Sequence, residues 1–202
     1  MSGYDAPHQV NSFAESGLRT LLMQNIERSG YKKPTPVQKY AMPIITKGRD
    51  LMGCAQTGSG KTAAFLLPLL HNLLEQGFET RSEQLPQLPE AVIIAPTREL
   101  VIQIKGTGRS VTSGTSSIYR GRGCKLNIAR AIDDMLFIFS CLIYLLDQSR
   151  KFANNSPLKS VCVYGGTSIP HQINQLKRGV NILVATPGRL LDFLDKGYIS
   201  FR

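Results

Sequence analysis

The chain has 202 residues, 42% of them hydrophobic and 19% charged, which is enough apolar sequence to bury a domain core and excludes a disordered segment. Lys and Arg number 24 against 14 Asp and Glu, and the net charge of +10 favours an anionic partner such as nucleic acid. The four cysteines lack metal-ligand spacing, and the first residues lack the apolar stretch of a secretory signal. We therefore expect an intracellular globular protein without a cysteine-bound metal.

Residues 1–48 predict an N-terminal helical segment. Apolar residues at helical spacing indicate one helix from Phe13 to Ser29, and the two prolines of the run Pro34–Gln38 predict an extended turn before a second helix. The amide of Gln38 both donates and accepts hydrogen bonds, as pairing with N6 and N7 of adenine requires. The alternative is an ordinary helix-entry turn.

A glycine-rich run is typical of a phosphate-binding loop. An apolar stretch from Leu51 to Ala55 predicts the strand before it, and Thr62–Leu70 predicts the helix after it, carried across a proline. Backbone N–H groups and the helix N-terminus would surround phosphates, Lys61 would supply a cation and Thr62 a hydroxyl for Mg²⁺. The alternative is an ordinary Gly/Ser turn. The predicted nucleotide-binding residues are Ala55, Gln56, Thr57, Gly58, Ser59, Gly60, Lys61 and Thr62.

Residues 49–202 predict a partial nucleotide-binding domain of the α/β class. Apolar runs alternate with helical stretches, which is typical of a mainly parallel sheet with ligands at the carboxyl ends of its strands. The polar run Glu75–Glu90 contains prolines and predicts a surface loop. The predicted strands are Leu51–Ala55, Ala91–Ala95, Ser160–Tyr164 and Asn181–Ala185.

Three loops after the later strands combine glycine, threonine and arginine in ways that suit a phosphodiester backbone. Taken singly, each has an ordinary alternative, a helix cap or a turn. Taken together, they would open on the same sheet edge as the phosphate-binding loop. The residues of these loops predicted to contact such a backbone, which the resemblance given next implies to be RNA, are Pro96, Thr97, Arg98, Gly165, Gly166, Thr186, Pro187, Gly188 and Arg189.

These motifs together resemble the first RecA-like domain of DEAD-box RNA helicases, over residues 1–104 and 149–202, and the tract Tyr164–Ser168 looks closest to the Vasa-type branch. The resemblance implies a RecA-like P-loop fold, ATP and Mg²⁺ as cofactors, and RNA bound through its backbone without sequence preference. It also implies that Phe13 packs against adenine, that Gln38 selects it, and that Lys61 and Thr62 serve catalysis.

The resemblance also implies what the chain lacks. Similar proteins carry an Asp-Glu-Ala-Asp motif downstream of Thr186–Arg189, and residues 1–202 contain no adjacent Asp-Glu pair. We therefore expect a sheet truncated before its central DEAD strand, no second domain, and no RNA-stimulated ATPase from residues 1–202 alone. The alternatives are a non-catalytic nucleotide- and RNA-binding fragment, or an unstable product of a mis-spliced transcript.

Residues 105–149 form an atypical insertion relative to the family. Its first half is rich in Gly, Ser and Arg, and its second half contains the apolar run Met135–Leu146, which is too short to span a bilayer. An RNA-binding insertion and a membrane-surface helix are two interpretations. Our preferred hypothesis is translated intron, which sequencing of the messenger RNA would decide.

The resemblance further implies partners and a location. We expect RNA as the partner, no membrane association, and contact with proteins of ribonucleoprotein granules. We expect a cytoplasmic protein, with perinuclear or germ-granule association as the more specific alternative.

Overall fold

The computed structural model describes residues 6–56, 58–77, 84–95, 117–120 and 138–201. The chain divides into two compact units, one made of residues 1–79 and 148–157 and the other of residues 80–147 and 158–202. The predicted division after residue 48 follows the motifs rather than the packing, and it falls inside the first unit. The phosphate-binding loop therefore belongs to the same unit as the N-terminal helices.

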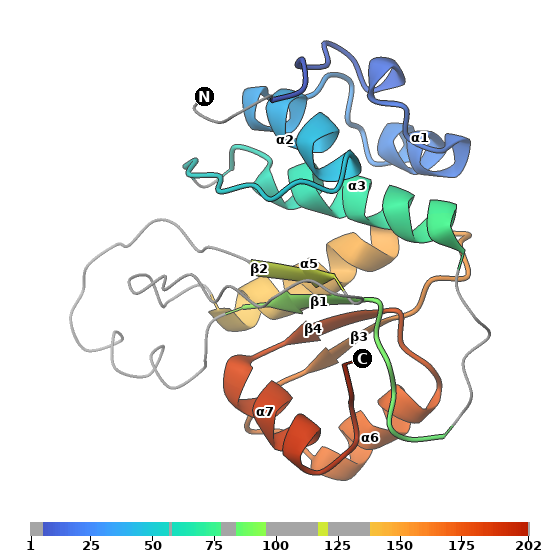
Figure 1. Cartoon of the computed structure of the whole chain (residues 1–202), viewed down its shortest axis with the longest axis vertical. Helices are drawn as coiled ribbons and strands as arrows, with labels where there is room; N and C mark the ends of the chain where they lie inside the picture. The colour runs from blue at the N-terminus through green and yellow to red at the C-terminus, as the bar shows by residue number, and fades with distance from the viewer. Residues whose placement is uncertain (1–5, 57, 78–83, 96–116, 121–137, 202) are drawn as a thin grey trace. The chain divides into compact units, whose positions relative to one another are not determined.

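The first unit is helical. Helices α1 and α2 both pack against α3 (Figure 1). The apolar side chains that made these segments amphipathic are buried, including Leu22 and Ile26 of α1 and Leu66 and Leu70 of α3. The elements of this unit are the short 3₁₀ helix η1 (Ala14–Ser16), α1 (Thr20–Arg28), α2 (Pro36–Thr46) and α3 (Lys61–Gln76).

The single helix predicted from Phe13 to Ser29 is interrupted. Gly17 ends η1 with a φ of 68°, a left-handed conformation that glycine adopts without a steric penalty, and α1 begins only at Thr20. The prediction of one helix was wrong, because the spacing of apolar residues gives no sign of a break at a single glycine. The helix predicted to cross Pro68 is confirmed, since Pro68 lies inside α3.

The strand predicted before the phosphate-binding loop was wrong. Residues 49–56 have no regular secondary structure, and Leu51 and Met52 are 40% and 84% exposed. A strand satisfies its backbone groups by pairing with a neighbouring strand. The described part of the first unit contains no strand, so this apolar run has no partner within its own unit.

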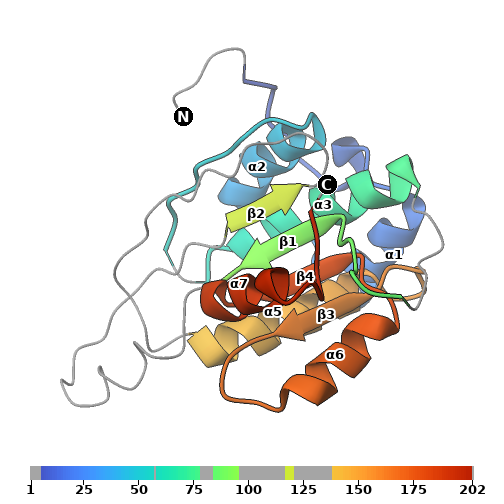
Figure 2. The ribbon, with the colours of Figure 1, turned by 60° about the horizontal axis from the view of Figure 1, so that its bottom comes forward.

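The second unit contains a four-stranded sheet in the order β2-β1-β4-β3 (Figure 2). The pairs β1–β4 and β4–β3 are parallel, and β2 pairs with β1 in the antiparallel direction. The mainly parallel α/β sheet is therefore confirmed. Its strands are β1 (Ala91–Ile94), β2 (Ser117–Arg120), β3 (Ser160–Val163) and β4 (Ile182–Ala185).

Helices α6 (Ile169–Lys177) and α7 (Pro187–Asp195) cover the same face of this sheet (Figures 1 and 2). Alternate residues of β3 and β4 point into the core that these helices close. That core comprises Val92, Val161, Val163, Leu176, Val180, Leu183, Ala185, Leu190, Phe193 and Ile199.

The predicted surface loop Glu75–Glu90 is only partly a loop at the surface. Helix α3 continues to Gln76, and Gln87 is 2% exposed. The backbone N–H of Gln87 donates to the Tyr198 carbonyl at 3.0 Å, and the Gln87 carbonyl accepts from Ser200 N at 3.0 Å. The segment is therefore joined to the end of the described chain within the second unit.

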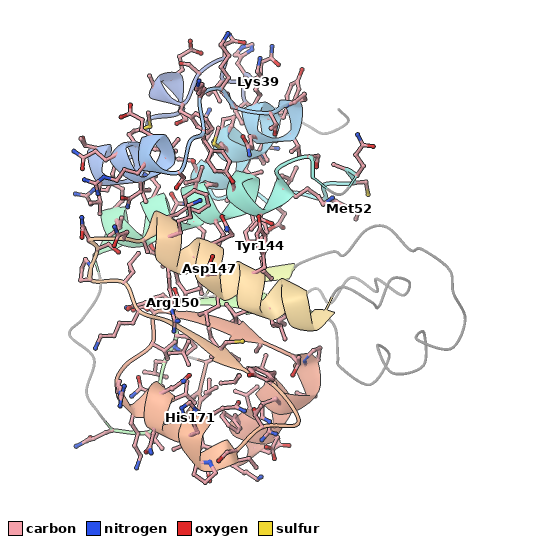
Figure 3. The ribbon with its side chains drawn as sticks, turned by 180° about the vertical axis from the view of Figure 1, so that it is seen from behind. Lys39, Met52, Tyr144, Asp147, Arg150 and His171 are labelled. Atoms are coloured by element: carbon pink, nitrogen blue, oxygen red, sulfur yellow. The ribbon has the colours of Figure 1, made fainter. Side chains whose placement is uncertain are left out.

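The segment predicted to be an atypical insertion, residues 105–149, contains β2 and most of α5 (Ile138–Phe152). In α5, Leu142 and Leu145 are buried, whereas Tyr144, Asp147 and Arg150 form an exposed line at three-residue spacing (Figure 3). Where its side chains are described, α5 is therefore buried on one side and exposed on the other. Within the residues that the structure describes, no helix has the length and apolarity needed to cross a membrane.

His71 of α3 generates a prediction on pH. Burial lowers the pKa of His71, an effect that Glu75 opposes and Arg19 reinforces. A histidine that stays neutral in the folded state stabilises the fold above its unfolded pKa of about 6.5 and loses that contribution as the pH falls below it. We expect the thermal midpoint to fall on acidification from pH 7 to pH 5, and His71→Gln to flatten that fall. The control is His171→Gln on the exposed side of α6 (Figure 3); equal slopes for both variants would contradict the assignment.

Candidate nucleotide and nucleic-acid sites

The backbone of the phosphate-binding loop has the shape that anion binding requires. Gly58 and Gly60 have φ values of 81° and 88°, a region that side-chain-bearing residues avoid. Gly60 is the N-cap of α3, so the loop ends at a helix N-terminus with its partial positive charge. A Cβ at Gly58 would meet nothing within 4 Å, so this part of the loop faces open space.

The side chain of Lys61 is hydrogen-bonded to the backbone of the loop. The Lys61 ammonium donates to the Gln56 carbonyl at 2.9 Å and also to the Ala55 carbonyl. The Ser59 hydroxyl is buried and has no hydrogen-bond partner among the described residues. A charged lysine, an unpaired hydroxyl and a helix N-terminus within one loop fit an anionic ligand.

The N-terminus of α2 holds the same loop. The Thr35 hydroxyl donates to the Ser59 carbonyl at 2.8 Å, and Gln38 Nε2 donates to the Gly60 carbonyl at 3.1 Å. Thr35 and Gln38 also form a capping box, in which Thr35 N donates to Gln38 Oε1 at 3.0 Å. Sequence reasoning missed the role of Thr35, although the Thr-x-x-Gln spacing of a capping box was present.

The residues predicted to contact adenine are engaged within the protein. Gln38 is fully buried and its amide bonds to Thr35 and Gly60. Phe13 is 5% exposed, and its ring lies 6.5 Å from that of Tyr31, which in turn lies 5.7 Å from Phe152. Adenine recognition by Phe13 and Gln38 stays a prediction.

A magnesium ion at this loop would depend on few protein groups. Among the residues with a described structure, no group of three or more His, Cys, Asp or Glu side chains comes together. Thr62 follows Lys61 at the start of α3 and is half-buried. The donor set therefore fits an ion held by one hydroxyl, phosphate oxygens and water, which is how Mg²⁺ binds beside nucleotides. Thr57 lies outside the described residues.

In the second unit, two of the predicted RNA-binding motifs meet at one edge of the sheet. Gly165 and Gly166 follow the end of β3, and Thr186 follows the end of β4. Val163 pairs with Ala185 in register, and the Thr186 N–H donates to the Val163 carbonyl at 3.1 Å. Pro96, Thr97 and Arg98 lie outside the described residues, so nothing tests their place at this edge.

The motif after β4 forms the N-terminus of α7. Thr186 is the N-cap and Pro187 the first helical residue, while a Cβ at Gly188 would meet nothing within 4 Å. The Arg189 guanidinium lies 3.5 Å from the Asp192 carboxylate and 5.5 Å from the centre of the Phe193 ring. Its side chain is 11% exposed, so this cation is held along the helix rather than extended into solvent.

Comparison with known protein families gives one match over most of the chain. Residues 35–135 and 143–201 match the model described as DEAD/DEAH box helicase. The family match extends through residues 105–135 of the predicted atypical insertion and resumes at residue 143, so only residues 136–142 of that segment lie outside it.

Known proteins of similar sequence carry helicase names. The chain is 41% identical to the ATP-dependent RNA helicase vasa of Drosophila melanogaster over 201 residues, which is 100% of this chain and 24% of that protein. It is 42% identical to the human protein named probable ATP-dependent RNA helicase DDX4 over 202 residues, 22% of that protein. The chain thus spans about a quarter of these relatives' length.

Solved structures of similar fold also belong to proteins described as RNA helicases or DEAD box proteins. The RNA helicase Prp28 from Chaetomium thermophilum, bound to ADP, has a TM-score of 0.66 and 35% identity over 98% of this chain and 38% of its own. A DEAD box protein from Methanococcus jannaschii has a TM-score of 0.61 and 27% identity, over 95% of this chain and 39% of its own. These likenesses confirm the RecA-like fold.

Gly60 generates a prediction on stability. A Cβ there would lie 2.5 Å from Gln38 Nε2 and 3.0 Å from Thr35 Oγ1, in a backbone conformation that alanine avoids. We expect Gly60→Ala to lower the free energy of unfolding by about 1–2 kcal/mol of backbone strain, plus ~1–3 kcal/mol from the forced displacement of Gln38. Gly30, with a φ of 79° and nothing within 4 Å, is the matched control. Chemical denaturation giving equal losses for Gly60→Ala and Gly30→Ala would contradict the contact.

Proposed function

Because the chain belongs to the DEAD/DEAH box helicase family, we propose that the whole protein is an ATP-dependent RNA helicase. This chain supplies its phosphate-binding loop and part of its RNA-binding surface. The observation that carries the proposal is the loop itself, whose two left-handed glycines lead into α3 and whose lysine is already placed beside it. The helicase names of the relatives support ATP as the nucleotide and RNA as the substrate.

ATP binding would use the groups of the first unit. The backbone N–H groups at the start of α3 and the Lys61 ammonium would contact the phosphates. The Thr62 hydroxyl would hold Mg²⁺, which when bound neutralises charge on the phosphate oxygens. The Ala55 and Gln56 carbonyls accept from the Lys61 ammonium, which has three N–H donors, so one donor remains for a phosphate oxygen.

RNA binding would use the sheet edge of the second unit. Gly165 and Gly188 leave room for a sugar-phosphate backbone, because a Cβ added at either glycine would meet no atom within 4 Å. The N-terminus of α7 offers backbone N–H groups, and Arg189 offers a guanidinium. Groups of this kind contact phosphates without reading bases, so the affinity would be independent of sequence and sensitive to salt.

The more specific biological setting is also a proposal. We propose a cytoplasmic protein that associates with ribonucleoprotein granules, on the strength of the tract Tyr164–Ser168 and of the 41% identity to vasa. Fluorescence imaging of the tagged full-length protein would test it, and a diffuse signal without granules would contradict it.

Lys61 provides the test of the nucleotide site. In the full-length protein we expect Lys61→Ala to weaken ATP binding by about ten- to a hundredfold, because a charge-assisted hydrogen bond to phosphate is lost. Binding of a fluorescent ATP analogue would measure this. Lys47→Ala, at an exposed lysine just after α2, is the control and should bind as the unmodified protein does. Equal affinities for the two variants would overturn the assignment of the loop.

Arg189 provides the test of the RNA surface. We expect Arg189→Ala in the full-length protein to weaken binding of single-stranded RNA similarly for all sequences. The slope of log affinity against log salt should fall by about one. The control is Arg178→Ala at the exposed C-cap of α6. Fluorescence anisotropy over a range of salt concentrations would measure both, and an unchanged slope for Arg189→Ala would contradict a phosphate contact.

A further inference from the structure

Gln172 of α6 is a buried polar residue to which the proposed function assigns no role. Its side chain is 3% exposed. Its Oε1 accepts from the backbone N–H of Tyr164 at 3.1 Å, and its Nε2 donates to the Tyr164 carbonyl at 2.9 Å. Nε2 also donates to the Thr167 hydroxyl at 2.5 Å. One amide therefore holds both backbone polar groups of Tyr164 and the side chain of Thr167.

These contacts enclose the glycine turn. Gly165 and Gly166 lie between Tyr164 and Thr167, and Gly166 has a φ of 79°. The Thr167 hydroxyl also donates to the Tyr164 carbonyl at 3.4 Å, which closes the turn on itself. Glycine pairs are the most mobile part of a backbone, because they lack a Cβ to restrict them. The Gln172 amide removes that freedom at both ends of the turn.

The same clamp fixes the turn relative to α7. Tyr164 follows Val163, whose carbonyl accepts the N–H of Thr186, the N-cap of α7. The backbone is therefore held from one side by Thr186 and, one residue later, from the other side by Gln172. The spacing between the glycine turn and the N-terminus of α7 is consequently set before any ligand arrives.

We infer that Gln172 is a positioning residue of the RNA-binding edge. It touches no RNA, and it acts by holding the Gly165–Gly166 turn at a fixed distance from Thr186–Arg189, so that both meet the same sugar-phosphate backbone. This inference rests on the proposed function. A backbone ligand gains affinity when its two contact points are already placed, because less conformational entropy is lost on binding.

The chemistry of the side chain favours positioning over filling of the core. A buried amide is unfavourable unless its donors and acceptors are paired, whereas an apolar side chain of the same length would fill the space without that requirement. The planar amide of glutamine offers a donor and an acceptor side by side, which suits the two backbone polar groups of one residue. Gln172 uses both on Tyr164.

The test compares RNA binding with nucleotide binding in the full-length protein. The main variant is Gln172→Met, which keeps the length of the side chain and removes its hydrogen bonds. Gln175→Met makes the same chemical change at a half-buried position of the same helix and is the matched control.

Anisotropy of a labelled single-stranded oligouridine reports RNA affinity, and a fluorescent ATP analogue reports nucleotide affinity. We expect Gln172→Met to weaken RNA binding about three- to tenfold, as the loss of one net hydrogen bond would. Nucleotide affinity should stay within about twofold.

A double-mutant cycle separates positioning from general loss of stability. Gly165→Ala adds a methyl group where nothing lies within 4 Å, so it should fold normally and obstruct the RNA. If Gln172 acts through the turn, Gly165→Ala should weaken RNA binding less in the Gln172→Met background than in the unmodified protein. Additive effects would overturn the inference.

Other outcomes of these measurements would also overturn the role of Gln172 or the proposed function. Equal RNA affinities for Gln172→Met and Gln175→Met would overturn the inference, and so would parallel losses of RNA and nucleotide affinity. If Gln172→Met does not fold, Gln172→Glu keeps one acceptor and loses both donors, and the same comparison applies to it. An unmodified protein that binds no oligouridine would overturn the proposed function, whereas binding that Gln172→Met leaves intact overturns this inference alone.

Discussion

The candidate nucleotide site depends on two hydrogen bonds that the N-terminus of α2 makes to the glycine-rich loop before α3. Thr35 and Gln38 bind the carbonyls of Ser59 and Gly60, two consecutive residues just before α3. Because Gln38 lies against the α-carbon of Gly60, only glycine fits there, and the loop has a preset curvature. The capping box that begins α2 uses the same two side chains, so the residues that start α2 also hold the backbone that leads into α3.

The second unit fixes its ligand groups in a different way, through strand register. The parallel pairing of β3 with β4 aligns Val163 with Ala185, and the loops after both strands therefore emerge side by side. The bond from Thr186 to Val163 then joins those loops directly. The first candidate site is shaped by helix capping, which involves residues close in sequence and can be read from a short motif. The second is shaped by sheet pairing between distant segments, which a short motif does not report.

Much of this arrangement was predictable from sequence. The predicted runs that begin at residues 91, 160 and 181 are short, apolar and bounded by turn residues, and all three contain a strand. The run from Leu51 to Ala55 has the same composition, yet it is exposed, because strand formation requires a partner that composition does not report. The amide of Gln38 was identified as a recognition group, but whether an amide faces a ligand or its own backbone depends on packing. The pairing of β2 with β1 was not predicted, because the sequence around residues 117–120 shows no clear strand period.

The contacts of Lys61 with the Ala55 and Gln56 carbonyls have a consequence for selectivity among anions. The two carbonyls occupy two of the three donors of the ammonium, so one donor remains for an incoming phosphate. We expect a ligand with a single phosphate group to gain little beyond a contact with that donor. A chain of phosphates brings further oxygens to the helix N-terminus at the same time and gains more. We therefore expect this loop to favour ligands with several phosphate groups over ligands with one.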